Sequence, residues 1–191
     1  MALKYTPSQT VGPYFSMCLG GPGQNVLVPA SEESRIRIVG SVYDAGGEPI
    51  DDALVELWQA NRYGRYRHPA DRREVLALTP GFTGFGRSGV DPVTLEFSFD
   101  TVKPGRVPAP DATLQAPHVC LVIQGRGMLR PSWTRLYFDD ETEANAEDFV
   151  LKRVPAARRH LLVARRQSDV TPTYRFDVRF QGPDETVFFE L

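Results

Sequence analysis

The sequence predicts an all-β fold, a β-sandwich carrying short peripheral helices and an extended N-terminal arm. Three observations lead to this prediction. Sixteen glycines and sixteen prolines, about one residue in six of the 191, are spread along the chain and favour many short elements divided by turns. Seven segments between these turns are rich in β-branched or aromatic residues, as a sandwich of short strands requires. Two of the seven also alternate apolar and polar residues.

The predicted strands follow one another along most of the chain. They are residues 35–43, 54–58, 94–100, 118–124, 134–138, 174–181 and 186–190. In the stretches 95–100 and 174–180 apolar and polar residues alternate, so one face of each strand is expected to contact a core and the other solvent or a partner. This alternation is the strongest structural signal in the sequence.

Two segments are predicted to be helical and to lie at the periphery of the sandwich. Residues 141–148 are rich in Ala and Glu, and residues 156–165 follow Pro155, a residue favoured where helices begin. The first 34 residues are rich in turn-forming residues and are not expected to form regular structure alone. Because this arm carries Tyr14 and Phe15, we expect it to pack on another surface. The prediction is one domain over residues 1–191, with residues 1–34 as its arm.

The charge balance argues against a nucleic acid or an anionic membrane as a partner. Lysine and arginine number 22, and aspartate and glutamate number 24, which gives a formal net charge of -2. No apolar stretch approaches the roughly 20 residues that a membrane helix requires. Cys18 and Cys120 are too few and too far apart for a disulfide framework, so we expect reduced thiols in a cytoplasmic protein.

Two segments carry side chains that could perform chemistry. Residues 57–68 end a strand and open a loop crowded with aromatic and cationic groups, which indicates either a ligand site or a core tryptophan beside solvated arginines. His118 and Cys120 are two residues apart on a predicted strand and therefore project from one face. They could bind a metal, or they could be a hydrogen-bonded core histidine and a small buried thiol.

A series of motifs runs in order along nearly the whole chain. The motifs are TVGPYF at 10–15, LWQAN at 57–61, GRYRH at 64–68, FTGFGR at 82–87, KPG at 103–105, PH at 117–118, TRLYFDDE at 134–141, YRFD at 174–177 and ETVFFE at 185–190. In this series the chain resembles the intradiol ring-cleaving catechol dioxygenases. The resemblance implies a sandwich of the transthyretin type.

The resemblance also implies a chemistry. In this family two tyrosinates and two histidines hold a non-haem ferric ion, a hard cation in a partly anionic cage that activates a bound catechol. The catecholate reacts with dioxygen and opens between its two hydroxyl-bearing carbons to give a muconate.

Matched residue by residue, this chain keeps only half of the family's ligand set. Tyr66 stands at the first tyrosine and His118 at the first histidine, but Val107 stands at the second tyrosine and Cys120 at the second histidine. Valine has no donor atom, and a thiolate is a soft, oxidisable ligand for ferric ion in the presence of dioxygen. A family arginine that stabilises the activated substrate aligns with Gln115. The resemblance therefore implies no metal and no catalytic residue in this chain alone.

The pattern of lost ligands is similar to that of the alpha chain in family members built from two kinds of subunit. This likeness implies an iron-bearing beta chain with Fe(III) as partner, a higher hetero-oligomer, protocatechuate and O2 as substrates, and the β-ketoadipate route of aromatic catabolism. In such members the arm and one arginine reach the substrate pocket of the beta chain. The matching residues here are Thr10, Gly12, Pro13, Tyr14 and Arg135. A guanidinium can bind the carboxylate of protocatechuate, and Gly with Pro lets backbone approach a flat ring.

Two other interpretations stay open from the sequence. The chain could be a self-sufficient ferric intradiol dioxygenase whose missing tyrosine is supplied by Tyr63 or Tyr137. It could also be a non-enzymatic binding module, because small sandwiches of the transthyretin type also carry ligands or mediate assembly.

Overall fold

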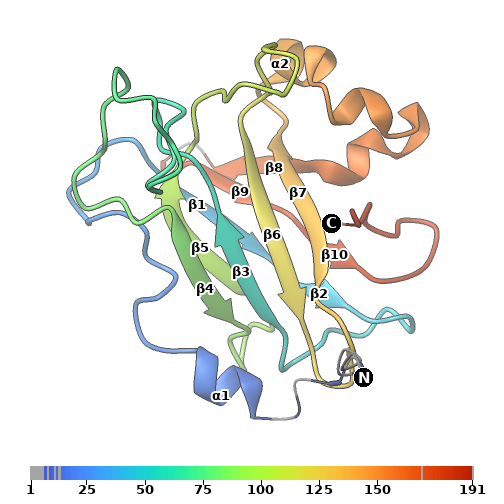
Figure 1. Cartoon of the computed structure of the whole chain (residues 1–191). Coiled ribbons are helices and arrows are strands. Elements are labelled where there is room, and N and C mark those ends of the chain that lie inside the picture. The colour runs from blue at the N-terminus through green and yellow to red at the C-terminus, as the bar shows by residue number, and fades with distance from the viewer. Residues whose placement is uncertain (1–6, 8, 11, 13, 169, 191) are drawn as a thin grey trace, which may run out of the picture.

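The structure, a computed structural model, describes residues 7, 9, 10, 12, 14–168 and 170–190. Eight strands form one hydrogen-bonded series in the order β4-β3-β6-β7-β8-β9-β1-β5, and β2 and β10 form a separate pair (Figure 1). The strands are β1 Arg35–Gly40, β2 Val42–Tyr43, β3 Leu54–Trp58, β4 Phe85–Gly89, β5 Phe97–Val102, β6 His118–Gln124, β7 Ser132–Phe138, β8 Val163–Ser168, β9 Thr173–Arg175 and β10 Val178–Arg179. The helices are α1 Phe15–Leu19, α2 Thr142–Glu147 and the 3-10 helices η1 Leu151–Arg153 and η2 Ala156–Leu162.

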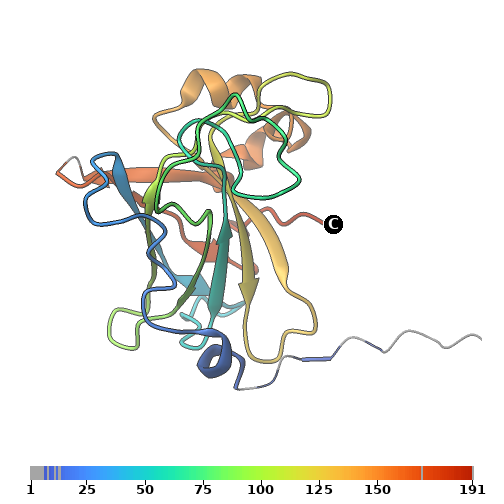
Figure 2. The same cartoon turned by 60° about the vertical axis from the view of Figure 1, so that its left-hand side comes forward.

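The series of eight strands bends into two layers, which confirms the predicted all-β sandwich. Strands β4, β3, β6 and β7 form one layer through antiparallel pairs, and β8, β9, β1 and β5 form the other (Figures 1 and 2). The strand series passes from one layer to the other through two residue pairs between β7 and β8. The core between them is built from alternate residues of facing strands, such as Leu57 and Leu121 on one side and Ile38 and Phe99 on the other.

The two alternating stretches behave as predicted. Phe97 and Phe99 of β5 are buried in the core, while the residues that follow each of them, Ser98 and Asp100, are half-buried. Along residues 174–180, the core-facing side chains are Tyr174, Phe176 and Val178. Period-two patterning therefore identified the buried face of both strands.

The predicted strands 35–43 and 174–181 are each divided in two, which corrects the sequence-based bounds. The break falls at Ser41, whose amide N–H donates to the Asp177 carboxylate at 3.1 Å instead of to a neighbouring strand. On one side of the break β1 pairs with β9, and on the other β2 pairs with β10, both in parallel. The Asp177 carboxylate, 136 residues from Ser41 in sequence, thus replaces a strand partner at the point where both predicted strands divide.

Two other sequence-based assignments were wrong, and two elements were missed. The helix predicted over residues 156–165 is a 3-10 helix that ends at Leu162, because Val163 and Ala164 pair with β7. Residues 186–190 form no strand; they run beside β7 with one isolated bridge, between Phe189 and Trp133. Strand β4 was missed, since its Phe-Gly-Arg-Ser-Gly sequence has weak strand propensity and pairing with β3 overrides it. The arm contains the short helix α1, which was also not expected.

The two ends of the sandwich differ. Helix α1 lies at one end, and the long connections after β3 and after β5 lie at the other (Figures 1 and 2). None of the helices in the described part of the chain has the length and apolar composition to cross a membrane. The site below lies at the end that carries the connections.

Candidate functional site

The floor of the site is the outer face of the layer β3-β6-β7. In register, Trp58 of β3 lies opposite Cys120 of β6, and Cys120 lies opposite Arg135 of β7. Two residues away on each strand, His118 lies opposite Tyr137, with ring centroids 5.8 Å apart. These residues share a face because alternate residues of a strand point the same way, while the intervening Leu57, Leu121 and others point into the core. The predicted common face of His118 and Cys120 is confirmed.

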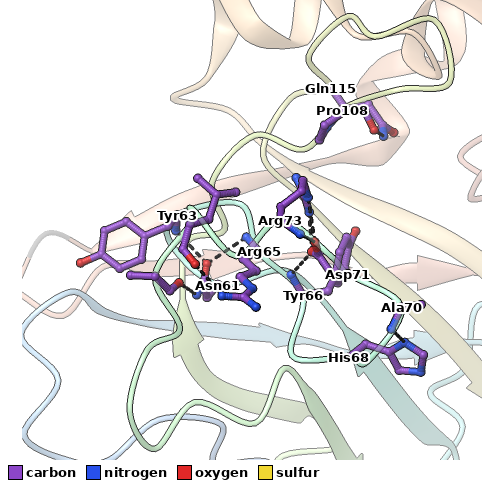
Figure 3. Close-up of polar contacts among 12 residues, drawn as sticks. Asn61, Tyr63, Arg65, Tyr66, His68, Ala70, Asp71, Arg73, Pro108 and Gln115 are labelled. Carbon is purple, nitrogen blue, oxygen red and sulfur yellow. Dashed lines mark hydrogen bonds and ion pairs between the residues drawn. The ribbon is translucent and has the colours of Figure 1, made fainter.

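The loop after β3 begins with a tight turn that the Asn61 side chain holds. Its Oδ1 accepts the backbone N–H groups of Tyr63 and Arg65 at 2.9 and 3.0 Å, and its amide donates to the Ala77 carbonyl at 2.8 Å (Figure 3). Gly64 in this turn has a φ of +78°, and a Cβ there would lie 2.2 Å from the Arg106 carbonyl oxygen. Only glycine permits this approach, which fixes the loop against the connection after β5.

Asp71 closes the same loop over the sheet. Its Oδ2 accepts the backbone N–H of Tyr66 at 2.8 Å, and its Oδ1 accepts from Arg73 Nε at 2.9 Å (Figure 3). The hydrogen bond from Arg73 holds the pKa of Asp71 well below its usual range, so the carboxylate stays ionised. This ion pair sets the position of Tyr66, whose ring stacks on Trp58 with centroids 5.7 Å apart and an 8° angle between planes.

Between this loop, the connection after β5 and the sheet lies a cavity of about 520 Å³. Its volume is in the range typical of small-molecule sites. The side chains that line it are Trp58, Tyr66, His68, Ala70, Asp71, Arg72, Arg73, Val107, Pro108, Gln115, His118 and Arg135. The cavity combines an aromatic wall with three arginines and one aspartate.

His118 is buried and neutral. Its Nδ1 lies 2.8 Å from the Ala116 carbonyl oxygen, so Nδ1 carries the proton and donates, and Nε2 is left as an acceptor. Burial, together with the nearby Arg135 cation, lowers the pKa of His118 to about 4. Burial raises the pKa of Tyr66 to about 12 and also raises the pKa of the Cys120 thiol. All three groups are therefore uncharged at neutral pH.

Arg135 is the half-buried cation of this group. Its Nη1 donates to Gln115 Oε1 at 2.8 Å and to the Tyr137 hydroxyl oxygen at 3.3 Å, and Cys120 lies opposite it in register on β6. The Tyr137 hydroxyl in turn donates to Asp148 Oδ1 at 3.0 Å. These two hydrogen bonds connect Arg135 to the Asp148 carboxylate through the Tyr137 hydroxyl, so the guanidinium and the carboxylate are not in direct contact.

These residues do not fit the ferric ion that the resemblance implies for the family. Of the four ligand positions, Tyr66 and His118 keep the family's donor types, whereas Val107 has no donor atom and Cys120 offers a soft, oxidisable sulfur in place of an imidazole. The Arg135 cation beside them would repel a trivalent ion. Among the described residues, no cluster of three or more His, Cys, Asp or Glu side chains could hold a metal.

The two tyrosines considered as replacements do not supply the missing ligand. Tyr137 is fully buried and its hydroxyl is engaged by Arg135 and Asp148. Tyr63 is 45% exposed, contacts the Arg62 guanidinium and is not among the side chains that line the cavity.

The structure gathers most of the sequence-predicted positions in this one cavity. Tyr66, Val107, His118 and Arg135 line it, and Cys120 lies below Arg135, facing an adjacent groove. Of the arm residues, Thr10 and Tyr14 are exposed and Gly12 is half-buried, whereas Pro13 lies outside the described residues. Sequence reasoning missed the roles of Asp71, Arg72, Arg73 and Asp148, which depend on loop geometry that no motif announces.

Comparison with known proteins defines the class. A family model described as Dioxygenase matches residues 11–182. Solved structures share the fold: the dioxygenase domain of a dioxygenase carbohydrate-binding protein fusion from Streptomyces sp. SirexAA-E superposes with a TM-score of 0.61 at 24% identity, covering 92% of this chain and 97% of that one. Catechol 1,2-dioxygenase from Pseudomonas arvilla C-1 gives a TM-score of 0.60 at 19% identity, covering 85% and 58%. The chain belongs to the intradiol dioxygenase family.

Within this family the chain is similar to a particular kind of subunit. It is 44% identical to the protocatechuate 3,4-dioxygenase alpha chain of Burkholderia cepacia, over 99% of this chain and 98% of the relative. It is 36% identical to the Pseudomonas putida alpha chain over the same shares of both chains. The Burkholderia cepacia beta chain is 34% identical over 80% of this chain and 66% of the relative.

Proposed function

We propose that this chain is the non-iron alpha subunit of a protocatechuate 3,4-dioxygenase. In the proposed complex a beta chain holds Fe(III) and cleaves protocatechuate with O2 to 3-carboxy-cis,cis-muconate. End-to-end similarity to two alpha chains supports this assignment. The observation that carries it is the cavity itself, where a cation, a thiol and a valine stand among the family's ligand positions. The iron, which gives the family its ring-opening chemistry, would then belong to the partner.

The arm is proposed to pack on the partner and to line its substrate pocket with Thr10, Gly12, Pro13 and Tyr14. Two features support this role. Tyr14 is 66% exposed, and the helix that follows it lies at the end of the sandwich opposite this chain's own cavity (Figure 2). Gly12 has a φ of +78° and nothing within 4 Å of a built Cβ, so its backbone is open to a flat ligand.

Arg135 is proposed to bind the carboxylate side of protocatechuate. Its support is chemical: the direct hydrogen-bond acceptors of this half-buried guanidinium are neutral, and Asp148 acts on it from behind Tyr137, so a carboxylate could still bind it directly. Arg135 lines both this chain's cavity and the adjacent groove of about 470 Å³, so a ligand in either space lies beside its side chain.

The cell compartment is proposed to be the cytoplasm. Both cysteines are free, Cys18 exposed and Cys120 half-buried, as a reducing environment would keep them.

Co-expression tests the proposed function. The full chain is purified alone and together with a beta chain, and iron content and ring cleavage are measured for each preparation. The proposal expects stoichiometric iron and ring cleavage in the complex, iron in the beta chain by native mass spectrometry, and neither in this chain alone. A coloured homo-oligomer of this chain with stoichiometric iron would establish the self-sufficient enzyme instead. No complex with any beta chain, combined with binding of an unrelated ligand, would favour the binding module.

A further inference from the structure

The cavity wall holds the Arg135 cation, whose direct hydrogen bonds go to neutral side chains. Within the described part of the chain Arg135 forms no ion pair: it donates to Gln115 Oε1 and to the Tyr137 hydroxyl, and Tyr137 separates it from the buried Asp148 carboxylate that also attracts it. Because Tyr137 stands between Asp148 and the guanidinium, an anion in the cavity could contact this half-buried cation directly and offset more of its desolvation cost.

The rest of the lining adds positive charge. Three arginines, Arg72, Arg73 and Arg135, face one aspartate, Asp71, and that aspartate is already paired with Arg73 at 2.5 Å. The excess is therefore two positive charges, three minus one. His118 adds no charge because burial keeps it neutral. The electrostatic potential of the cavity favours an anion over a neutral molecule of the same shape.

The shape of the cavity favours a flat ring. Trp58 and Tyr66 stack with nearly parallel planes on one side, and Val107 and Pro108 supply apolar surface on another. About 520 Å³ accommodates a substituted benzene ring with room for water. Aromatic ligands gain from such a wall by stacking as well as by burial.

We propose that this cavity is a second ligand site, independent of iron, that binds aromatic monocarboxylates with the carboxylate toward Arg135 and the ring against Trp58 and Tyr66. The position where the family binds a cation has become a position that binds an anion. The site itself requires neither a partner nor ring cleavage, but the tests below use the complex and therefore rest on the proposed function.

The first test compares two probes of one shape. Benzoate and its neutral isostere benzamide are titrated by calorimetry into the full chain in its complex, while the ferric visible band reports occupancy of the partner's site. The proposal expects a second site whose occupancy leaves the visible band unchanged, called the silent site below. This site should bind benzoate roughly tenfold or more tightly than benzamide, as a charged hydrogen bond requires. Equal affinities for the two probes, or no site beyond the one that the band reports, would overturn it.

The second test locates the site. In crystals of the complex, the anomalous signal of 4-iodobenzoate is expected between Trp58 and Arg135, and iodine elsewhere only would contradict the proposal. Arg135→Gln should weaken benzoate binding at the silent site roughly tenfold and leave benzamide unchanged. Arg126→Gln is the matched control, because Arg126 is exposed and pairs with Asp52 away from the cavity.

If Arg135→Gln does not fold, Arg72→Gln replaces it. Arg72 is exposed at the rim, so its loss should leave the fold intact and weaken benzoate binding several-fold, more so at low salt. Unchanged benzoate affinity in Arg72→Gln would count against the proposal. Ring cleavage is also assayed in the parent complex. A parent complex that cleaves the ring but has no silent site refutes this inference only, and a silent site without ring cleavage refutes the proposed function only.

Discussion

Replacing Asp148 by Asn tests how the floor of the cavity is held in place. Asp148 is fully buried and accepts four hydrogen bonds. Its Oδ2 accepts the Ala116 N–H at 2.8 Å, and its Oδ1 accepts from the Tyr137 hydroxyl and from the N–H groups of Val150 and Leu151 at 3.0, 2.9 and 2.8 Å. One carboxylate thus ties the start of β6 to β7 and to η1.

The cost of the Asp148→Asn substitution follows from these contacts. If the asparagine oxygen takes the place of Oδ1, three bonds remain and the amide N–H₂ faces the Ala116 N–H, donor against donor. One buried donor is then unsatisfied, which costs about 1–3 kcal/mol, and the opposite orientation loses three bonds and costs more. A loss of about 2 kcal/mol corresponds to roughly 4–8 °C in melting temperature for a chain of this length.

The assay is calorimetric melting of the complex, with hydrogen exchange at the Ala116 amide as the local readout. The Asp148→Asn variant should melt several degrees lower, and its Ala116 amide should exchange faster than in the parent. Asp111→Asn is the control, since Asp111 is exposed and bonds only Thr113 nearby, and it should leave both readouts nearly unchanged. A variant with the parent's melting temperature and Ala116 protection would refute the reasoning.

Four further outcomes are expected in the complex. Arg135→Ala should raise KM for protocatechuate roughly tenfold to a hundredfold with little loss of iron, and unchanged kinetics would remove Arg135 from the substrate pocket. Deleting the arm through Tyr14 should weaken assembly or substrate binding without unfolding the sandwich, so full activity in the deletion would refute the role of the arm. Tyr66→Phe should leave kcat nearly intact, and a large loss would mean that Tyr66 serves a metal. The pKa of His118 falls from 6.5 to about 4 on folding, so the unfolded chain binds this proton at a higher pH than the folded chain does. The free energy of unfolding should therefore decline by roughly 3 kcal/mol as pH falls from 6.5 to 4. His118→Gln should flatten the pH dependence of the melting temperature over this range, and an unaltered slope would disprove the assignment.

Local patterning predicted the fold wherever the buried face determined the strand. Strands β3 and β6 were predicted with their observed bounds, because apolar runs bounded by turns are local signals. The pattern failed where a distant group decides the conformation. Strand β8 exists because Val163 pairs with Tyr137, and the break at Ser41 exists because of Asp177. The local sequence around Val163 or Ser41 does not indicate which distant residue it will contact.

The site divides in the same way. Resemblance to the family brought Tyr66, Val107 and His118 together correctly, since those positions follow motifs that the chain still carries. It gave no indication that Asp148 anchors the floor from 32 residues beyond Ala116. Such a contact depends on the complete tertiary structure, and a lone aspartate after a short helix does not announce it.

The departures from the family's ligand set are physically consistent with one another. Each of three replaced positions suits a guanidinium and none suits a ferric ion: Gln115 offers a carbonyl acceptor, Cys120 a protonated thiol that accepts weakly, and Val107 only apolar surface. An arginine in place of Gln115 would set two guanidinium groups side by side, with strong repulsion at this depth. Of the replaced positions, Gln115 is the one that Arg135 contacts by a hydrogen bond, so the side chain standing at the family's arginine position now accepts from the cation. Together these positions place a cation beside apolar surface, a lining that suits an anionic aromatic ligand and not a ferric ion.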